Sequence, residues 1–226
     1  MDLNLFVWNV FKGQKKEFFE NDFSRLTKQA DFILLQEAML DQKMPDLWQK
    51  NHPQHHWKMA ASFEYTKNNI RTGVATGSRI QALDIMPMRT AFREFFFLTP
   101  KISLFSYYQI QDTSEKLLLI NTHAINFTTT KVFHGFLLEL IPAIAKHQGP
   151  LILAGDFNTW NSQRMKTLSE ILSPFALQLQ TFEVDQRLLR LDHIFLRGFD
   201  VQTANILSDV KSSDHFPLQL KLRLKG

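Results

Sequence analysis

The sequence contains no cysteine among its 226 residues. Disulfide bonds and thiolate metal ligands are therefore excluded, although a chain without cysteine fits any cellular compartment. No stretch rich in proline, glycine or serine interrupts the chain, and no internal repeat or low-complexity tract divides it. We therefore expect one domain that spans residues 1–226.

Long apolar runs are also missing. None approaches the roughly 20 residues that a membrane-spanning helix requires. The start, Met1-Asp-Leu-Asn, lacks the basic residues of a secretory signal. We expect a cytoplasmic protein without a transmembrane segment, while export by a route without a cleaved signal stays compatible with the sequence.

The composition is that of an ordinary globular protein, with 44% hydrophobic and 21% charged residues in a chain long enough to bury a sizeable core. The net charge of +4 and the pI near 9.3 permit nucleic-acid binding without requiring it. Lysine and arginine are spread along the chain with acids between them, whereas a dedicated duplex binder concentrates them on one face. We expect a monomer, although the sequence does not fix the oligomeric state.

Strand-like runs dominate the pattern, and helical periodicity is limited to a few segments. The expected strands are 3–9, 31–37, 57–63, 72–78, 92–98, 102–111, 116–124, 150–157, 191–197 and 216–224, and the expected helices are 15–29, 131–147 and 161–172. The helix over 131–147 carries an apolar stripe despite Pro142, and Asn161 or Ser162 is suited to cap the last helix. Many strands with helices packed outside favour an α/β sandwich of two sheets.

The run Leu151-Ile-Leu-Ala-Gly-Asp-Phe-Asn158 ends an apolar strand in a carboxylate and an amide. Gly155 permits a close approach of the backbone to a ligand, and the parity of Asp156 and Asn158 predicts that both lie on one side. The alternative is that Asp and Asn only form a turn after the strand.

Other polar residues also stand at the ends of apolar runs, which weakens that alternative. They are Asn9, Gln36, Glu37, Asn121, His123, Asp192 and the triplet Ser213-Asp214-His215. Burying isolated carboxylates and amides costs several kcal/mol each unless they are paired or bound to metal. The recurrence therefore predicts one converging site.

These residues, in this order, resemble the successive motifs of the endonuclease/exonuclease/phosphatase superfamily. The motifs are Trp8-Asn9, Gln36-Glu37, Thr122-His123, Gly155-Asp-Phe-Asn158, Leu191-Asp192 and Ser213-Asp-His215. Three longer stretches, 8–12, 121–127 and 154–160, further resemble the bacterial YafD-like branch. The resemblance implies a four-layer αββα fold of the DNase I-like type, with a two-layer β-sandwich flanked by helices.

The resemblance also implies hydrolysis of a phosphate ester with a hard cation. Glu37 would offer oxygen ligation to Mg²⁺, with Asn9 and Asp214 near the same ion, and Mn²⁺ is an alternative. This sparse oxygen ligand set suits magnesium better than zinc.

The remaining motif residues would handle protons and the phosphoryl group. Asp192 would orient His215 by accepting from its ring N–H, Asp156 would activate water or carry a proton, and Asn158 would donate to a phosphoryl oxygen. His123 places the chain with the histidine-containing DNase I-like and sphingomyelinase-like branches, where it would act as general acid opposite His215 as base. The alternative for His123 is a strand histidine whose hydrogen bonds are satisfied.

Several other features favour structural explanations. His52, His55 and His56 are expected in a solvated loop, and strand alternation sends His193 to the face opposite Asp192. The 21 phenylalanines are expected to fill a two-sheet core rather than to contact lipid. Four arginines, Arg71, Arg79, Arg89 and Arg93, lie where relatives flank their substrate cleft, but ordinary surface charge explains any one of them.

Three functions are compatible with the sequence. The first is a Mg²⁺-dependent phosphodiesterase, a nuclease on DNA or RNA. The second is a phospholipid or sphingomyelin phosphodiesterase, or a small-molecule phosphatase of the inositol type, which needs an exposed apolar hairpin or a headgroup pocket. The third, a binding module without catalysis, predicts missing catalytic groups, and none of the motif residues is missing.

Overall fold

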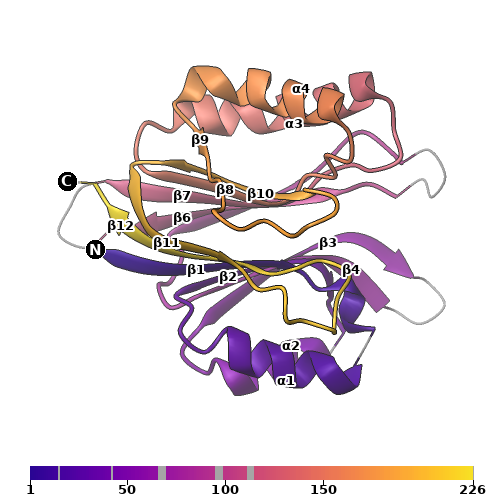
Figure 1. Cartoon of the computed structure of the whole chain (residues 1–226), viewed down its shortest axis with the longest axis vertical. Helices are drawn as coiled ribbons and strands as arrows, with labels where there is room; N and C mark the ends of the chain where they lie inside the picture. Colours follow the sequence, from indigo (N-terminus) through magenta and orange to yellow (C-terminus); the bar gives the residue numbers. More distant parts are fainter. Residues whose placement is uncertain (15, 42, 66–69, 95–98, 111–114, 226) are drawn as a thin grey trace.

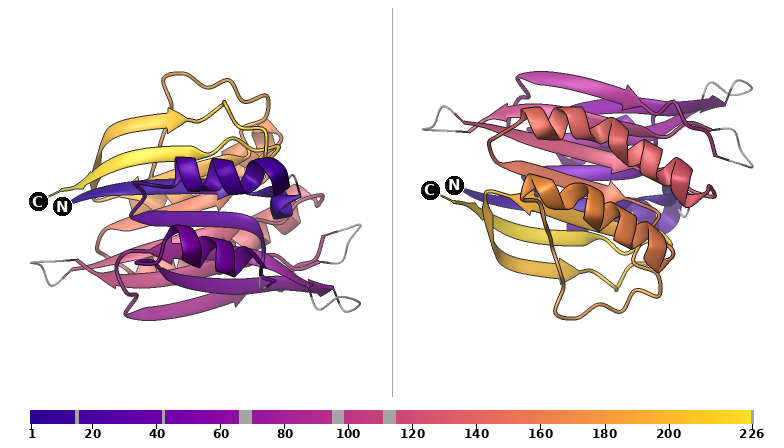
Figure 2. Two further views of the ribbon diagram at one scale, coloured as in Figure 1. Left: turned by 90° about the horizontal axis from the view of Figure 1, so that it is seen from below. Right: turned by 90° about the horizontal axis from the view of Figure 1, so that it is seen from above.

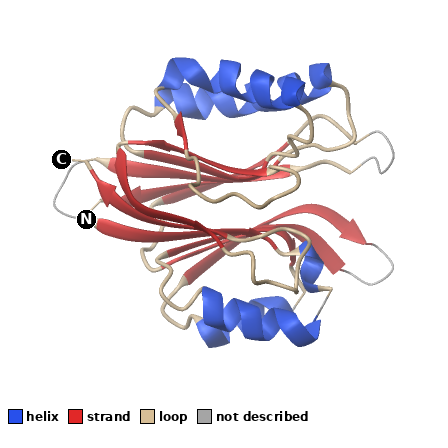
Figure 3. Cartoon of the chain, viewed as in Figure 1, coloured by secondary structure: helices blue, strands red, loops and turns tan. Residues whose placement is uncertain are grey.

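Two mixed β-sheets pack face to face, and helices cover the outer face of each (Figures 1 and 3). The computed structural model describes residues 1–14, 16–41, 43–65, 70–94, 99–110 and 115–225. The layer order is helix, sheet, sheet, helix, which confirms the αββα sandwich expected from the sequence.

The first sheet has the strand order β11-β12-β1-β2-β4-β3. Strands β1 and β2 run parallel, and the other neighbours run antiparallel. The strands are β1 (Asp2–Asn9), β2 (Phe32–Met39), β3 (His56–Tyr65), β4 (Ile70–Ser78), β11 (Phe199–Ile206) and β12 (Leu218–Leu224).

The second sheet has the order β5-β6-β7-β8-β10-β9. Here β7 and β8 are the parallel pair. The strands are β5 (Asp84–Arg89), β6 (Ile102–Gln109), β7 (Lys116–His123), β8 (Leu151–Asp156), β9 (Gln178–Leu179) and β10 (Asp192–Arg197).

The helices divide between the two outer faces, as the views from below and above show (Figure 2). Helices α1 (Lys16–Leu26) and α2 (Lys43–Asn51) cover the first sheet, and α3 (Thr130–Lys146) and α4 (Ser162–Leu172) cover the second. Two short 3₁₀ turns, η1 (Phe11–Gly13) and η2 (Ser173–Phe175), complete the elements. Among the described residues, no helix combines the length and the apolar character that crossing a bilayer demands.

Helices α3 and α4 follow the sequence pattern closely. The predicted stripe of α3 is buried at Phe136, Leu137, Leu140 and Ile144. Asn161 caps α4, since its side chain accepts a hydrogen bond from the Arg164 amide at 2.8 Å. Such a cap contributes about 1 kcal/mol.

Strand alternation explains how the chain fills three apolar layers. In β1, Leu5 and Val7 enter the layer between the sheets, whereas Phe6 and Trp8 face α1 and α2. Trp8 stacks on Phe19 of α1 with ring centroids 5.4 Å apart. A third layer lies between the second sheet and helices α3 and α4. Among the described residues, ten phenylalanines are buried in these layers, in line with the core role predicted from the composition.

A buried polar bridge joins the two sheets. The Asn121 side-chain amide in β7 donates to the carbonyl oxygens of Ala75 at 2.9 Å and Leu35 at 3.3 Å, both in the first sheet. Its oxygen accepts from the Gln36 amide at 2.7 Å. Asn121 and Gln36 were grouped with the site on sequence; the structure gives them this inter-sheet role instead.

Gly155 is needed for strand packing. Its φ of 141°, and the 2.0 Å that would separate an added Cβ from the Thr122 carbonyl oxygen, leave no space for a side chain. The close approach is to the neighbouring strand β7, and this corrects the expectation that the glycine accommodates a ligand.

Some elements differ from the prediction. Strands β5, β9 and β11 and helix α2 were not foreseen. The expected strand 92–98 is wrong over 92–94, which form a loop, and residues 95–98 lie outside the described part of the chain. Pro217 delays the start of the last strand to Leu218, because proline cannot donate to the sheet ladder.

Candidate active site

The motif residues meet at one end of the sandwich because of the two parallel strand pairs. Asn9 and Glu37 stand at the carboxyl ends of β1 and β2. His123 and Asp156 end β7 and β8 and are register partners. Asp192 opens the antiparallel strand β10 directly opposite Asp156. Both sheets therefore contribute to one constellation.

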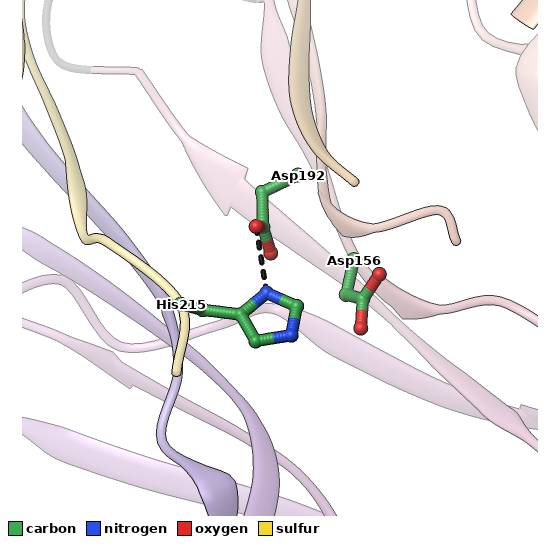
Figure 4. A group of neighbouring side chains, drawn as sticks. All are labelled: Asp156, Asp192 and His215. Carbon is green, nitrogen blue, oxygen red and sulfur yellow. Dashed lines mark hydrogen bonds and ion pairs between the residues drawn. The ribbon is translucent and has the colours of Figure 1, made fainter. Parts of the chain in front are cut away.

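An aspartate–histidine–aspartate cluster forms the centre (Figure 4). Nδ1 of His215 lies 2.8 Å from Oδ2 of Asp192, and the imidazole reaches from this bond toward Asp156. One ligand atom from each of the three residues lies within 4.8 Å of the others. Backbone contacts hold His215 in place, since its carbonyl accepts from the Trp8 indole at 3.0 Å and its amide donates to the Ser213 hydroxyl at 3.1 Å.

The charges in this cluster depend on one another. Although burial lowers the pKa of His215, the neighbouring Asp192 and Asp156 raise it to about 10. Burial and the charge of Asp192 raise the pKa of Asp156 to about 7. At neutral pH, His215 is therefore an imidazolium beside a carboxylate poised between its two protonation states.

Hydrogen bonds orient the Asp156 carboxylate. The Asn9 side chain donates to Oδ2 at 2.9 Å, and the backbone amide of Asn158 donates to Oδ1 at 2.9 Å. The strand ends at Asp156, so Asn158 does not share its face by strand parity. Its side chain donates to the Ala124 carbonyl at 3.0 Å. Asp156 and Asn158 therefore form the turn after the strand and are also part of the site.

His123 lies between the cluster and a basic side chain. Its Nε2 is 3.6 Å from Asp156 and 3.8 Å from Glu37, and the Lys101 ammonium lies 3.3 Å from the same nitrogen. Burial, and then the charge of Lys101, lower the pKa of His123 well below its usual value. A neutral ring that accepts from Lys101 fits this geometry.

The predicted metal ligands are distributed along the edge of the cluster. Asn9 contacts Asp156, and Glu37 lies near His123 with its side chain 25% exposed. Asp214 is exposed and accepts a bond from the Ser213 hydroxyl at 3.4 Å. Within the described residues, no hydrogen bond joins Asn9, Glu37 and Asp214 to one another. That set stays a prediction.

The site nevertheless has the chemistry of a cation site. Its donors are carboxylate and amide oxygens, which hard divalent cations prefer. Oδ1 of Asp192 is buried and lacks a hydrogen-bond partner among the described atoms. A buried carboxylate oxygen without a partner is costly, and a cation or a bound water would relieve that cost. The oxygen donors of the site therefore fit a divalent metal.

Unusual backbone conformations are concentrated around the site. Positive φ angles occur at Phe11, Lys12, Glu37 and Asn158. At Glu37, with φ 49°, the register between β2 and β4 shifts by a bulge. Each such residue costs on the order of 1–3 kcal/mol, and such strain collects at functional sites. At this bulge the two neighbouring side chains have different surroundings. Glu37 lies near His123, whereas Gln36 is buried and donates to Asn121.

A cleft of about 370 Å³ opens beside the cluster, with Glu37 and His123 in its wall. Lys12 and Lys101 also line it, and Lys101 pairs with the buried Glu94 at 3.2 Å. Sequence reasoning missed both lysines as site residues. Lys12 closes the Trp8–Lys12 motif, which was a signal for it, whereas Lys101 reaches the site only because β6 pairs with β7.

The other histidines lie outside the cluster. His193 points to the opposite face, as strand alternation predicted, and contacts the Thr159 hydroxyl at 2.6 Å. The solvated-loop expectation is wrong for His52 and His55, which are buried and contact Thr27 at 2.6 Å and Ala30 at 3.0 Å. His56 is exposed at the start of β3.

Solved structures share the whole architecture. An endonuclease/exonuclease/phosphatase from Bacteroides vulgatus superimposes with a TM-score of 0.80 at 14% identity, covering 100% of both chains. A mannosyl-6-phosphatase from Bacteroides thetaiotaomicron superimposes with a TM-score of 0.77 at 16% identity, covering 98% of this chain and 100% of its own. At these identities the likeness shows a DNase I-like fold.

Fold and site together define a phosphoric ester hydrolase of the DNase I-like class. The model of the endonuclease/exonuclease/phosphatase family matches residues 6–215, and the chain belongs to this family. A UPF0294 protein of Vibrio cholerae serotype O1 is 32% identical over 233 residues, covering 99% of this chain and 78% of its own length. This relationship confirms the resemblance to the YafD-like branch.

Proposed function

We propose that the protein is a Mg²⁺-dependent phosphodiesterase that cleaves DNA or RNA strands. The observation that carries the proposal is the Asp156–Asp192–His215 cluster at the ends of parallel strands, beside a cleft with two lysines. Because both sheets contribute to this cluster, we also infer that residues 1–226 act as one catalytic domain.

The cation would be held by Glu37, with Asn9 and Asp214 completing the ligand set. When bound, it would neutralise charge on the phosphate and polarise the phosphorus–oxygen bonds. Among the chain's own groups, Lys12 and Lys101 would add fixed positive charge along the cleft, where the anionic substrate must lie.

Asp156 and His215 would handle the attacking water and the phosphoryl oxygens. With a pKa of about 7, Asp156 is ionised in a large fraction of molecules at neutral pH and can accept a proton from water. The His215 imidazolium, held by Asp192, would donate to a phosphoryl oxygen. The raised pKa of His215 disfavours the role of general base that was expected for this residue. We therefore infer that Asp156 is the base.

His123 and Asn158 would act on the leaving side. Burial holds His123 neutral in the free enzyme, so its role as general acid requires the charge of the bound phosphate to raise its pKa. Asn158 would donate a second amide hydrogen to the phosphate while it holds Ala124.

The test is hydrolysis of a substrate panel by the wild type and by Glu37→Ala, Asp156→Ala and His215→Ala. The panel contains single-stranded DNA, RNA, sphingomyelin, inositol phosphates and bis-p-nitrophenyl phosphate, each with Mg²⁺ and with EDTA. We expect Mg²⁺-dependent cleavage of a nucleic acid, lowered at least ~10²-fold in each variant.

The matched control is His56→Ala, which removes an exposed histidine outside the cluster and should keep full activity. Circular dichroism establishes that each variant is folded. Full activity in all three folded variants would refute the proposed site, and cleavage of lipid or small esters alone would refute the nuclease assignment.

One observation favours lipid as a second candidate substrate. The segment before Asp192 exposes Val184, Leu188 and Leu189, with Leu188 98% exposed. A lipid phosphodiesterase requires exposed apolar side chains, and this segment leads in the sequence to Asp192. Flotation with phosphatidylcholine–sphingomyelin liposomes tests it, and protein that stays at the bottom of the gradient argues against lipid.

A further inference from the structure

A second hollow, of about 270 Å³, adjoins the active-site cleft. Ser62, Phe63 and Pro100 line both spaces, so the two lie side by side. The hollow lies beside β3 and β5, which are edge strands of the two sheets. A long substrate bound in the cleft can therefore extend into it.

Three arginines give the second hollow its character. Arg71 comes from β4, Arg89 ends β5, and Arg93 lies in the loop that follows β5. The lining includes one carboxylate, Glu64, so positive charge is in excess. Guanidinium groups suit this arrangement, because their planar forks match two oxygens of a phosphate.

Two of these arginines differ from most others in the protein. Arg25, Arg79, Arg187, Arg190 and Arg223 each form an ion pair with an aspartate. Within the described part of the chain, no ion pair satisfies Arg71 or Arg89. Arg89 donates to the Ala61 carbonyl at 2.8 Å, which fixes its side chain across the two sheets. A guanidinium has five N–H donors, so most of them stay available to a ligand.

Arg71 is coupled to the active site through the backbone. Its carbonyl accepts from the Leu40 amide at 2.8 Å, at the end of the strand that carries Glu37. The next residue, Thr72, lines the active-site cleft itself. The position of Arg71 relative to Glu37 is thus set by the pairing of β2 with β4.

We propose that Arg71, Arg89 and Arg93 bind a second phosphate of the substrate, adjacent along the strand to the phosphate that is cleaved. The inference rests on the proposed nuclease function and makes it more specific. It predicts that the enzyme prefers strands with several phosphates over substrates that offer a single phosphodiester.

The test measures binding, so it does not depend on turnover. Fluorescence anisotropy gives the Kd of a short fluorescein-labelled single-stranded DNA and of a labelled dinucleotide, in EDTA, over a series of salt concentrations. For the double variant Arg71→Gln/Arg89→Gln, we expect affinity for the strand to fall about tenfold or more. The salt dependence should weaken by about one unit of slope for each arginine.

Two comparisons make the result specific. The dinucleotide, with its single phosphate, should lose less affinity than the strand. The control Arg79→Gln removes an exposed arginine of the region after β4 that pairs with Asp31 and lines neither hollow, so it should bind like the wild type. The single substitution Arg71→Gln breaks none of the described side-chain contacts. This single variant is used in place of the double variant if the double variant does not fold.

The outcomes separate this inference from the proposed function. Unchanged strand affinity, or an equal loss for strand and dinucleotide, overturns the second phosphate site even if the wild type cleaves DNA. A selective loss of strand affinity supports the site. If the wild type then fails to cleave any strand with Mg²⁺, the nuclease function falls while the phosphate site stands.

Discussion

Two buried carboxylates and one imidazole determine the chemistry at the residue scale. Asp192 holds the His215 ring by a direct hydrogen bond, and Asp156 faces the pair from the neighbouring strand. Each carboxylate favours the imidazolium, and the imidazolium in turn limits how far burial raises the pKa of Asp156. The charge states of Asp156 and His215 therefore depend on each other.

The activity should follow a bell-shaped pH profile. As pH rises through about 7, Asp156 loses its proton and kcat/KM increases, whereas the loss of the His215 proton near pH 10 lowers it again. Asp192→Asn removes the charge that stabilises the imidazolium, so the falling limb should move to lower pH. Initial rates over pH 5–10.5 measure both limbs.

The exposed His56 supplies the control for this profile, because His56→Gln should leave both limbs in place. A falling limb that stays at the same pH in a folded Asp192→Asn variant would contradict the assignment to His215.

Most of the cluster could be predicted from sequence, because polar residues that end apolar runs have few explanations. Asn9, His123, Asp156, Asp192 and His215 come together as expected. The local sequence pattern does not reveal that sheet pairing brings Lys101 to the site. It also does not reveal that a bulge directs Gln36 away from the site. The charge states of Asp156 and His215 could not be predicted from the sequence either, because they depend on burial and on neighbouring charges.

At the scale of elements, the Asn121 bridge connects the two sheets through hydrogen bonds in an otherwise apolar layer. Asn121→Ala would leave the Gln36 amide and the Ala75 carbonyl without this partner. We expect a loss of about 2–4 kcal/mol in the free energy of unfolding, measured by urea denaturation.

The exposed Asn205 on β11 offers a matched control, and Asn205→Ala should change stability by no more than about 0.5 kcal/mol. Equal stability of the two variants would show that the bridge contributes little.

The elements that sequence reasoning missed lack a strong apolar signal. Strand β11 reads Phe199-Asp-Val-Gln-Thr-Ala-Asn-Ile206 and is mostly exposed at the edge of its sheet. Strand β5 contains Pro87 and is also an edge strand, where proline is tolerated. Helix α2 contains Pro45 near its start, where the missing N–H costs nothing. Buried central strands were found because both of their faces are apolar.

At the scale of the whole molecule, metal binding should stabilise the fold. A cation that binds only the folded protein adds about 2.7 kcal/mol at a hundredfold excess over its Kd. We expect the Tm in Mg²⁺ to exceed the Tm in EDTA, and Glu37→Gln to reduce this difference. Differential scanning calorimetry measures it independently of catalysis.

Glu170→Gln, which alters an exposed glutamate on α4, should keep the full Mg²⁺ effect. Identical Tm values with Mg²⁺ and EDTA in the wild type would contradict a resident magnesium site.

The pairing of β12 with β1 has a consequence for the timing of activity. His215 lies three residues before the start of β12, whereas Asn9 closes β1, so the site joins groups that are far apart in the sequence. During translation, residues 215–224 must emerge from the ribosome before β12 can pair with β1 and bring the imidazole to Asp192. Until that segment has emerged, a nascent chain lacks the complete site.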